Sequence, residues 1–305
     1  MGSATVAVIV VTWNSAEVLP GLLASLEDGL KGVDWHLTVA DNASSDRTLT
    51  VLQETVPAAT TVQTGYNAGY AAAINAALAR LEPCTAVLIL NPDIRLAPGC
   101  VAAMLARLDE PGTGIVVPRL TGEGGELTHS LRREPAVLRA FGEALLGNRR
   151  AGRYPRLGEI VTAEDAYRTA GTADWATGAA MLVSWACVRA CGPWDESFFL
   201  YSEETEYALR ARDLGFSTRL APEAEAVHLE GDSEVSPRLW TLLTLNKVRL
   251  YRRRHGLPAA ALFWAATLLR ELSRGLLGHR RSRRAAAALL SPSRLRTRPT
   301  AENLA

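Results

Sequence analysis

Cysteine is scarce in this chain of 305 residues, and its four cysteines form no CxxC pair. Pairs of that kind are the usual signature of zinc sites and of disulfide frameworks. The two closest thiols, Cys187 and Cys191, are four residues apart in a segment with helical spacing. We therefore expect buried, reduced thiols and a cytoplasmic protein.

The chain also lacks a long hydrophobic run and a basic leader. Its longest nearly apolar stretch, 257–269, has 13 residues, whereas a helix that crosses a bilayer needs about 20. The N-terminus passes almost directly into the apolar segment 4–11 without a cleavage site. The glycine-rich GxGxxG fingerprint is missing after this segment, which disfavours an NAD-dependent enzyme. These absences argue against a membrane span and against secretion by a signal peptide.

Charge is distributed unevenly although the net charge is only +1. Residues 247–305 hold 14 basic and 2 acidic residues, which leaves 19 basic and 30 acidic residues for 1–246. An acidic body with a basic C-terminal segment predicts an anionic partner, and we expect a membrane surface and no nucleic acid. In one interpretation, 257–305 is an amphipathic helix with an arginine-rich anchor at the membrane surface. In the other, it is a terminal helix packed on the domain with a disordered arginine tail.

The first half of the chain has the rhythm of an α/β protein. Apolar, β-branched runs at 5–11, 37–40 and 86–90 alternate with helical patterns at about 15–28, 46–56 and 69–81, which predicts a parallel sheet with crossover helices. Between 118 and 172 the pattern loosens, and we expect a mobile insertion or an acceptor-side region there. Further on we expect a helix at 203–214, short strands near 217–220 and 225–229, and a long helix from about 236. The predicted division is a catalytic domain 1–256, with a donor half 1–118 and an acceptor and catalytic half 119–256, followed by the tail 257–305.

Polar clusters follow the three predicted strands, at 12–15, 41–46 and 91–93. Ligands of open α/β sheets bind beyond the carboxyl ends of the strands, so we expect these clusters to meet at one edge. Asp41 is suited to accept the imide N–H of a uracil or thymine, and Asp46 is suited to cap the next helix. Capping alone would also explain both aspartates.

Asp93 and His228 are the candidate metal ligands. A diphosphate donor brings concentrated negative charge, and a divalent cation held by a carboxylate commonly neutralises it. Asp93 follows an apolar strand in Asn91-Pro92-Asp93, where a simple helix-start role is the alternative. His228 ends a short apolar strand shortly before Gly231, although a lone histidine is more often structural.

Two further segments carry candidate site residues. Gly69 enters an alanine-rich helix, where a small residue lets backbone approach a ligand and the helix N-terminus favours anions. Glu203, Glu204 and Glu206 open a helix after an aromatic run, with Ser202 as its expected N-cap. The helix dipole alone would favour such acidic residues. Displacement at an anomeric carbon, however, needs a base for the acceptor hydroxyl proton, which a carboxylate can supply.

Taken in order, these segments resemble family 2 of the inverting GT-A glycosyltransferases, and most closely the bacterial rhamnosyltransferases that act on a polyprenyl-diphosphate-linked sugar. The resemblance runs from about residue 5 to residue 231 and is more specific than any single motif. The matching segments are VVTWNS at 10–15, DNASSDRT at 41–48, GYNAGYAAAIN at 65–75, LNPDIRL at 90–96, WATGAAMLV at 175–183, GPWDESFFLYSEETEYALRARDLGF at 192–216 and AVHLEG at 226–231.

The resemblance implies a GT-A fold, that is, a single Rossmann-like, mostly parallel sheet flanked by helices, with Mg²⁺ or Mn²⁺ as cofactor. It makes Glu204 the catalytic base, at a position where the family usually has aspartate, and it gives the metal to Asp93 and His228. The assigned donor-binding residues are Thr12, Trp13, Asn14, Asp41, Asn67, Gly69, Asn91 and Asp93. The assigned acceptor-binding residues are Trp175, Thr177, Gly178, Tyr201 and Glu203.

The implied activity is transfer of L-rhamnose from dTDP-rhamnose to a polyprenyl-diphosphate-linked saccharide in cell-wall or polysaccharide synthesis, at the inner face of the cell membrane. One alternative keeps this chemistry but uses a soluble natural-product acceptor or a UDP-sugar donor. A second alternative is a nucleotide-sugar-binding scaffold without catalysis, because Glu204 replaces the usual aspartate and Asn91 replaces a first aspartate.

Overall fold

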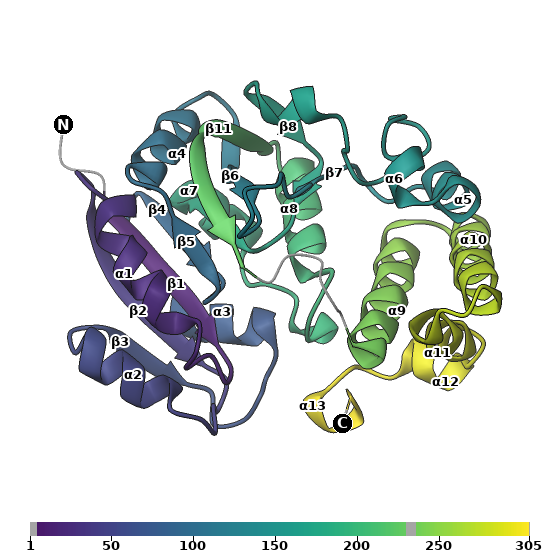
Figure 1. Cartoon of the computed structure of the whole chain (residues 1–305), viewed down its shortest axis with the longest axis horizontal. Helices are drawn as coiled ribbons and strands as arrows, with labels where there is room; N and C mark the ends of the chain where they lie inside the picture. The colour runs from purple at the N-terminus through teal and green to yellow at the C-terminus, as the bar shows by residue number, and fades with distance from the viewer. Residues whose placement is uncertain (1–4, 230–235, 305) are drawn as a thin grey trace.

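A nine-stranded sheet lies at the centre of the computed structural model, which describes residues 5–229 and 236–304 (Figure 1). The strand order is β3-β2-β1-β4-β10-β6-β11-β5, and β8 pairs with β11. The strands are β1 (Thr5–Thr12), β2 (Asp34–Asp41), β3 (Thr60–Gln63), β4 (Ala86–Leu90), β5 (Ile94–Leu96), β6 (Thr113–Thr121), β8 (Gly171–Ala173), β10 (Ala180–Ser184) and β11 (Ser217–His228). A separate pair joins β7 (Leu131–Arg132) to β9 (Trp175–Ala176). The expected α/β class and mostly parallel sheet are confirmed.

Strand β1 is buried on both faces because helices cover both sides of the sheet. Its even-numbered valines pack with α1 (Leu19–Gly29) and α4 (Cys100–Leu108). Its odd-numbered residues pack with α3 (Tyr70–Leu78), α7 (Trp185–Cys191) and α8 (Glu203–Asp213). Each valine or isoleucine so buried contributes roughly 1.5–3 kcal/mol relative to an exposed side chain. The continuous apolar run of the sequence thus becomes the central strand.

The order of the strands reverses beside β1. Parallel strands β2 and β4 flank β1, and the chain reaches β2 first, through α1, and β4 only after α2 (Thr48–Thr55), β3 and α3. In open α/β sheets this switch point opens a crevice at the carboxyl ends of the strands. The polar clusters after β1, β2 and β4 therefore share one edge, as the sequence predicts.

Two segments are more regular than the sequence indicates. The region 118–172 contains the end of β6, the strand β7, helices α5 (Val137–Leu146) and α6 (Asn148–Ala151), and a 3₁₀ turn (Glu164–Tyr167). The two short strands expected at 217–229 are one strand, β11, whose pairing with β6 shifts register between Ala221 and Glu225. This irregularity interrupts the alternation of buried and exposed residues, which explains why the sequence pattern reads as two pieces.

Helices form the C-terminal part of the chain and pack together beside the sheet domain (Figure 1). They are α9 (Pro237–Arg254), α10 (Leu257–Leu276), α11 (Arg280–Leu289), α12 (Pro292–Arg296) and α13 (Ala301–Leu304). The arginine-rich segment is helical, and one face of α11 is buried at Ala285, Ala286, Ala288 and Leu289. The expectation of a disordered arginine tail was therefore wrong, because the alanines between the arginines give α11 an apolar side.

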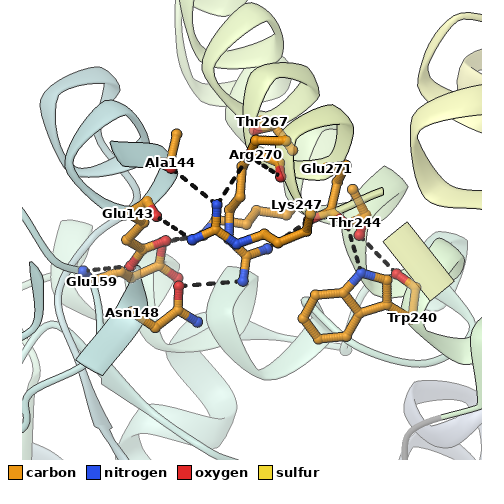
Figure 2. A network of polar contacts seen from close by, with 12 residues as sticks. Glu143, Ala144, Asn148, Glu159, Trp240, Thr244, Lys247, Thr267, Arg270 and Glu271 are labelled. Atoms are coloured by element: carbon orange, nitrogen blue, oxygen red, sulfur yellow. Dashed lines mark hydrogen bonds and ion pairs between the residues drawn. The ribbon is translucent and has the colours of Figure 1, made fainter. Parts of the chain in front are cut away.

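A buried ionic network fastens α5, α9 and α10 to one another (Figure 2). Lys247 Nζ lies 3.3 Å from Glu143 Oε2 and 2.8 Å from Glu159 Oε2. Burial alone would lower the pKa of Lys247, but the two carboxylates raise it above its ordinary value, so the lysine stays charged. Nearby, Arg270 pairs with Glu271 at 2.7 Å, and Glu271 accepts the indole N–H of Trp240 at 2.9 Å.

Candidate active site

The carboxylate of Asp41 is held at the end of β2 by the end of β1. Thr12 and Asp41 are paired in register, and the Thr12 hydroxyl donates to Asp41 Oδ1 at 2.7 Å. Ser44 donates its hydroxyl to the same oxygen at 2.6 Å and its N–H to Oδ2 at 2.9 Å. Asp41 is fully buried. Most of its hydrogen-bonding capacity is used inside the protein, which leaves Oδ2 as the oxygen with room for a further donor.

The loop after β1 is bonded to the loop after β2. Asn14 has a positive φ of 50°, its N–H donates to the Ser44 hydroxyl at 2.8 Å, and its side-chain oxygen accepts the Ser45 N–H at 2.8 Å. Asp46 accepts the N–H of Thr48, the first residue of α2, at 3.0 Å, so it supplies the helix-start contact that the sequence predicts. Trp13 is 56% exposed beside them. These loops therefore form a rigid wall with one free aromatic face.

The glycine-rich turn before α3 is fixed to β2 and to a distant loop. Buried Asn42 donates to the Gly69 carbonyl at 3.2 Å, and Asn67 accepts the Gly69 N–H at 3.2 Å. Gly69 has a φ of +93°, and a Cβ there would lie 2.3 Å from the Phe199 carbonyl oxygen. The N–H of Tyr70 donates to that same carbonyl at 2.8 Å. Only glycine fits here, because the turn packs directly against the backbone that leads to Glu203 and Glu204.

Asp93 and His228 meet as predicted, although 135 positions separate them in the sequence. The antiparallel pairing of β5 with β11 sets His228 opposite Ile94, and His228 Nε2 lies 3.1 Å from Asp93 Oδ2. The other oxygen, Asp93 Oδ1, is buried and has no hydrogen-bond partner. Asn91 lies just before them, its N–H bonded to the Ala179 carbonyl at 2.8 Å. Glu230 and Gly231, the last residues of the matching segment, lie outside the described residues.

The donor set of this pair fits a divalent cation. Two neighbouring ligands of an octahedral ion, each 2.0–2.1 Å from it, lie about 3 Å apart, and the observed separation of 3.1 Å agrees. Carboxylate oxygen with imidazole nitrogen suits Mn²⁺, and carboxylate oxygen with water and phosphate suits Mg²⁺. Within 5–229 and 236–304 there is no cluster of three or more histidine, cysteine or acidic side chains arranged for a metal. Asp93 and His228 would therefore hold such an ion together with a ligand's own oxygens.

Glu203 and Glu204 enter the site side by side at the start of α8. Oε2 of each is buried without a hydrogen-bond partner. Burial, and for Glu203 also the charge of Glu204, raises the pKa of both carboxyls, while Arg132 acts to lower that of Glu204. The hydroxyl of half-buried Tyr70 donates to the Gly178 carbonyl at 3.2 Å. Burial, and after it the charges of Glu203, Glu204 and Asp93, raise the pKa of Tyr70 well above its ordinary value, so the three carboxyls all act on one tyrosine.

The loop before Glu203 is strained and is fastened by one asparagine. Phe199, Tyr201 and Ser202 all have positive φ, at 65°, 67° and 77°, although none is glycine. Asn246 of α9 is fully buried, and its amide donates to the carbonyls of Phe198, Leu200 and Tyr201 at 2.8, 2.9 and 3.1 Å. Ser202 is the N-cap residue, but its side chain makes no capping bond, which corrects the expectation. Backbone strain of this kind persists only where the surroundings enforce it.

The assigned acceptor residues line the other side of Glu204. A Cβ on Gly178 would lie 3.4 Å from Glu204 Cβ, and the Gly178 carbonyl accepts the Tyr70 hydroxyl at 3.2 Å. Trp175 is buried, with its indole bonded to the Arg133 carbonyl at 3.1 Å and the Arg132 guanidinium 5.7 Å from its ring. Thr177 bonds through its backbone to Ser130 at 3.1 Å. Trp175 therefore acts through packing here, and Gly178 lies against the carboxylate.

Four residues of this site were missed by the sequence analysis, namely Asn42, Tyr70, Arg132 and Asn246. Asn42 and Tyr70 stand inside segments that were already singled out, so their positions beside Asp41 and Gly69 offered a signal. Arg132 and Asn246 belong to segments without a motif. Their contacts depend on long-range packing, which the local pattern does not reveal.

Comparison with known proteins agrees with this geometry. Residues 7–166 match the model of glycosyl transferase family 2, which is more than half of the chain. The chain belongs to glycosyltransferase family 2. This member is also 28% identical, over 244 residues, to the N-acetylglucosaminyl-diphospho-decaprenol L-rhamnosyltransferase of Mycobacterium tuberculosis, in a match that covers 74% of this chain and 76% of that protein.

Solved glycosyltransferase structures share the GT-A fold of this family 2 glycosyltransferase. The mannosyltransferase PcManGT from Pyrobaculum calidifontis, in complex with GDP-Man and Mn²⁺, superposes with a TM-score of 0.58 at 17% identity, covering 97% of this chain and 86% of that one. S. aureus TarS 1-349 in complex with UDP superposes with a TM-score of 0.52 at 16% identity, covering 93% and 90%. At these identities the likeness establishes the fold.

Proposed function

We propose that this family 2 glycosyltransferase transfers L-rhamnose from dTDP-rhamnose to a polyprenyl-diphosphate-linked saccharide, with inversion at the anomeric carbon. The observation that carries the catalytic part is the position of Glu204 against Gly178, whose carbonyl accepts the Tyr70 hydroxyl at 3.2 Å, together with the pairing of Asp93 with His228 at 3.1 Å. Glu204 Oε2 and Asp93 Oδ1 are both buried and unpartnered. Such atoms are costly unless a ligand completes them, which supports a binding role for both.

The donor half, 1–118, would bind the nucleotide. The Oδ2 oxygen of Asp41 would accept the N–H of a thymine or uracil ring, while Thr12 and Ser44 keep the carboxylate oriented from behind. Trp13 and Asn14 border the same pocket, and Asn67 and Gly69 present backbone at the N-terminus of α3, where an anionic group is favoured. Asn91 would contact the sugar-phosphate end of the donor.

Glu204 would remove the proton from the acceptor hydroxyl as that oxygen attacks the anomeric carbon. The bond from this carbon to the phosphate oxygen breaks, and the nucleoside diphosphate leaves with the electron pair. Asp93 and His228 would hold Mg²⁺ or Mn²⁺, which when bound supplies Lewis-acid stabilisation of the leaving diphosphate. Glu203 and Tyr201 would orient the acceptor, and Trp175, Thr177 and Gly178 would shape its side of the pocket.

The choice of sugar and acceptor rests on the named mycobacterial relative. That protein is a rhamnosyltransferase for a decaprenol-linked acceptor and matches about three quarters of this chain. A lipid-linked acceptor also agrees with the basic C-terminal segment, since polyprenyl diphosphates reside in a membrane and carry negative charge.

The test is release of nucleoside diphosphate by the purified full chain with Mn²⁺, across a panel of dTDP-, UDP- and GDP-sugars, with and without a short polyprenyl-diphosphate-linked N-acetylglucosamine. We expect dTDP-rhamnose to be consumed fastest, and only with the lipid-linked acceptor. Faster use of a UDP-sugar would show that the proposed donor is wrong. Faster transfer to a soluble saccharide would show that the proposed acceptor is wrong. Inactivity with every donor would favour a binding scaffold.

A further inference from the structure

Two rows of leucines lie exposed on helices that are far apart in the sequence. Leu138 and Leu145 are seven residues apart on α5, and Leu262, Leu269 and Leu276 continue the same spacing on α10. Seven residues make almost two helical turns, so each row runs along one face of its helix. Leu145 is 74% exposed and Leu276 is 86% exposed. Leucines this open, arranged in rows, differ from the single exposed leucines that any protein surface carries.

The two rows belong to one layer, because α5 and α10 pack side by side and run in the same direction. Near the start of each helix, Val137, Ala140 and Phe141 share a core with Ala260 and Phe263. Near the end of each, the Arg274 guanidinium donates to the Ala144 carbonyl at 3.0 Å and Arg270 donates to Asn148 at 3.2 Å. The ionic network in Figure 2 fixes the inner faces of both helices. The exposed leucine rows therefore lie on two neighbouring helices that are fixed to each other, and we call this pair the α5–α10 platform.

A row of positively charged arginines borders this platform. Arg149, Arg150, Arg153 and Arg156 follow α5 directly and are exposed, and none has an ion-pair partner within the described part of the chain. Their segment runs back along α5, where Arg139 donates to the Pro155 carbonyl at 3.0 Å. The only acidic residues of 137–157 and 257–300 are Glu143 and Glu271, and both are turned inward into the network. The border is thus positive and unneutralised.

We propose that the α5–α10 platform docks this enzyme on an anionic lipid bilayer, with the leucines in the interface and the arginines on the headgroups. The proposal rests on the lipid-linked acceptor proposed above. A bilayer fits better than a second copy of the chain, because two copies joined face to face would bring like-charged arginine borders together. No helix in 5–229 or 236–304 is long and apolar enough to cross a membrane. Through 133–136, α5 joins directly to Arg132 and thus to the acceptor side of the site.

This placement differs from an anchor made of the basic tail alone. The platform takes one helix from the middle of the chain and one from the C-terminal part, whereas α11, which holds four of the tail's nine arginines, packs on α9 and α10. Docking would hold Glu204 at a fixed height above the bilayer, where the diphosphate of a lipid-linked acceptor lies.

The experiment is sedimentation of the full-length protein with vesicles of phosphatidylcholine alone and of equal parts phosphatidylcholine and phosphatidylglycerol. We expect the wild type to bind the anionic vesicles. The double variant Leu145→Ser with Leu276→Ser should bind them at least about tenfold more weakly, since it removes two exposed leucines from the interface. The matched control is Leu214→Ser, which changes a leucine that is 52% exposed on the catalytic body and should bind like the wild type. Arg149→Glu with Arg153→Glu should remove the preference for anionic vesicles.

Sugar transfer to the lipid-linked acceptor dispersed in detergent, without vesicles, separates this inference from the proposed function, because none of these variants lies in the catalytic site and all should transfer sugar like the wild type. Wild-type binding by the leucine double variant, or no vesicle binding by the active wild type, would overturn the docking surface and leave the glycosyltransferase intact. A wild-type dimer in solution that the leucine variant converts to a monomer would assign the platform to self-association and would also overturn it.

Discussion

The donor side and the catalytic side of the site are built in opposite ways. On the donor side, Thr12, Asp41 and Ser44 bond to one another, and Asn42 fastens the turn at Gly69. On the catalytic side, one oxygen each of Asp93, Glu203 and Glu204 is buried without a partner. The first set of side chains is satisfied within the protein, while the second retains free hydrogen-bonding capacity.

This difference indicates which residues of the site lower the stability of the folded protein. A buried polar atom without a partner costs about 1–3 kcal/mol, and the three positive-φ residues before α8 add strain of similar size. The unpartnered oxygens belong to Asp93, Glu203 and Glu204, whereas positive φ occurs on both sides, at Asn14 and Ala43 on the donor side and at the three residues before α8. The donor side is therefore a bonded frame, and bound substrates and a metal would complete the catalytic side.

Apart from substitution of the proposed base Glu204, the largest loss of activity should follow from Asp93→Asn. The amide keeps the shape of the side chain but removes the charge that would hold a divalent cation, and loss of several kcal/mol of Lewis-acid stabilisation lowers the turnover by about 10²-fold or more. Nucleoside diphosphate release measured against Mn²⁺ concentration checks this result. Asp109→Asn, on the exposed end of α4, serves as the control and should not change the Mn²⁺ response. An unchanged Mn²⁺ response in Asp93→Asn would place the metal elsewhere.

Alanine variants of Gly69 and Gly65 test the contact between the glycine-rich turn and the loop before α8. Gly69→Ala forces a Cβ to within 2.3 Å of the Phe199 carbonyl, whereas Gly65→Ala meets nothing within 4 Å, and both have positive φ. Both variants place alanine at a positive φ, and only Gly69→Ala adds a contact with the 199–203 loop. We expect Gly69→Ala to raise the KM for donor and to lower kcat by about tenfold beyond the Gly65→Ala variant. Equal kinetics in the two variants would mean that the turn and the loop are not coupled.

Asn246→Leu should release the strained loop before α8. It removes the two amide N–H donors that the carbonyls of Phe198, Leu200 and Tyr201 share, so we expect a loss of about 2–4 kcal/mol in the free energy of unfolding. Turnover should fall by about tenfold because Glu204 loses its fixed position. Thr244→Val, which removes a buried hydroxyl bond within α9 alone, is the control for stability. Chemical denaturation and steady-state kinetics measure both, and normal turnover in Asn246→Leu would contradict a positioning role.

The smallest expected effect is a shift of the pH profile. Burial disfavours the charged form of Glu204 and raises its pKa, and Arg132 opposes this. A base works only when ionised, so the rate should rise with pH through a pKa above that of an ordinary glutamate. In Arg132→Gln the pKa should rise further and the acidic limb should move to higher pH. The control Arg119→Gln, which breaks an ion pair with Glu225, should leave the acidic limb in place. An acidic limb that neither variant moves would show that Arg132 does not affect the pKa of Glu204.

Much of the sheet, and the meeting of the polar clusters that follow its strands, could be predicted because their signals are local. β1 and β4 are continuous apolar runs, and the polar clusters that follow them stand next to them in the sequence. The contact between Asp93 and His228 was also predicted, from strand ends and the family resemblance. The register shift in β11, the packing of α11 and the clamp formed by Asn246 could not be predicted, since each depends on contacts between residues far apart in the chain.

The proposal that Glu204 is the catalytic base is tested most directly by comparing the transfer rates of Glu204→Gln and Glu206→Gln. The two glutamates lie in the first turn of α8, but Glu206 is paired with Arg210 at 2.8 Å while Glu204 Oε2 has no partner. We expect a loss of about 10²–10⁴-fold in Glu204→Gln, the range of a general base, and near wild-type transfer in Glu206→Gln. Wild-type transfer in Glu204→Gln, at unchanged stability, would contradict the assignment of the unpartnered carboxylate as the catalytic base.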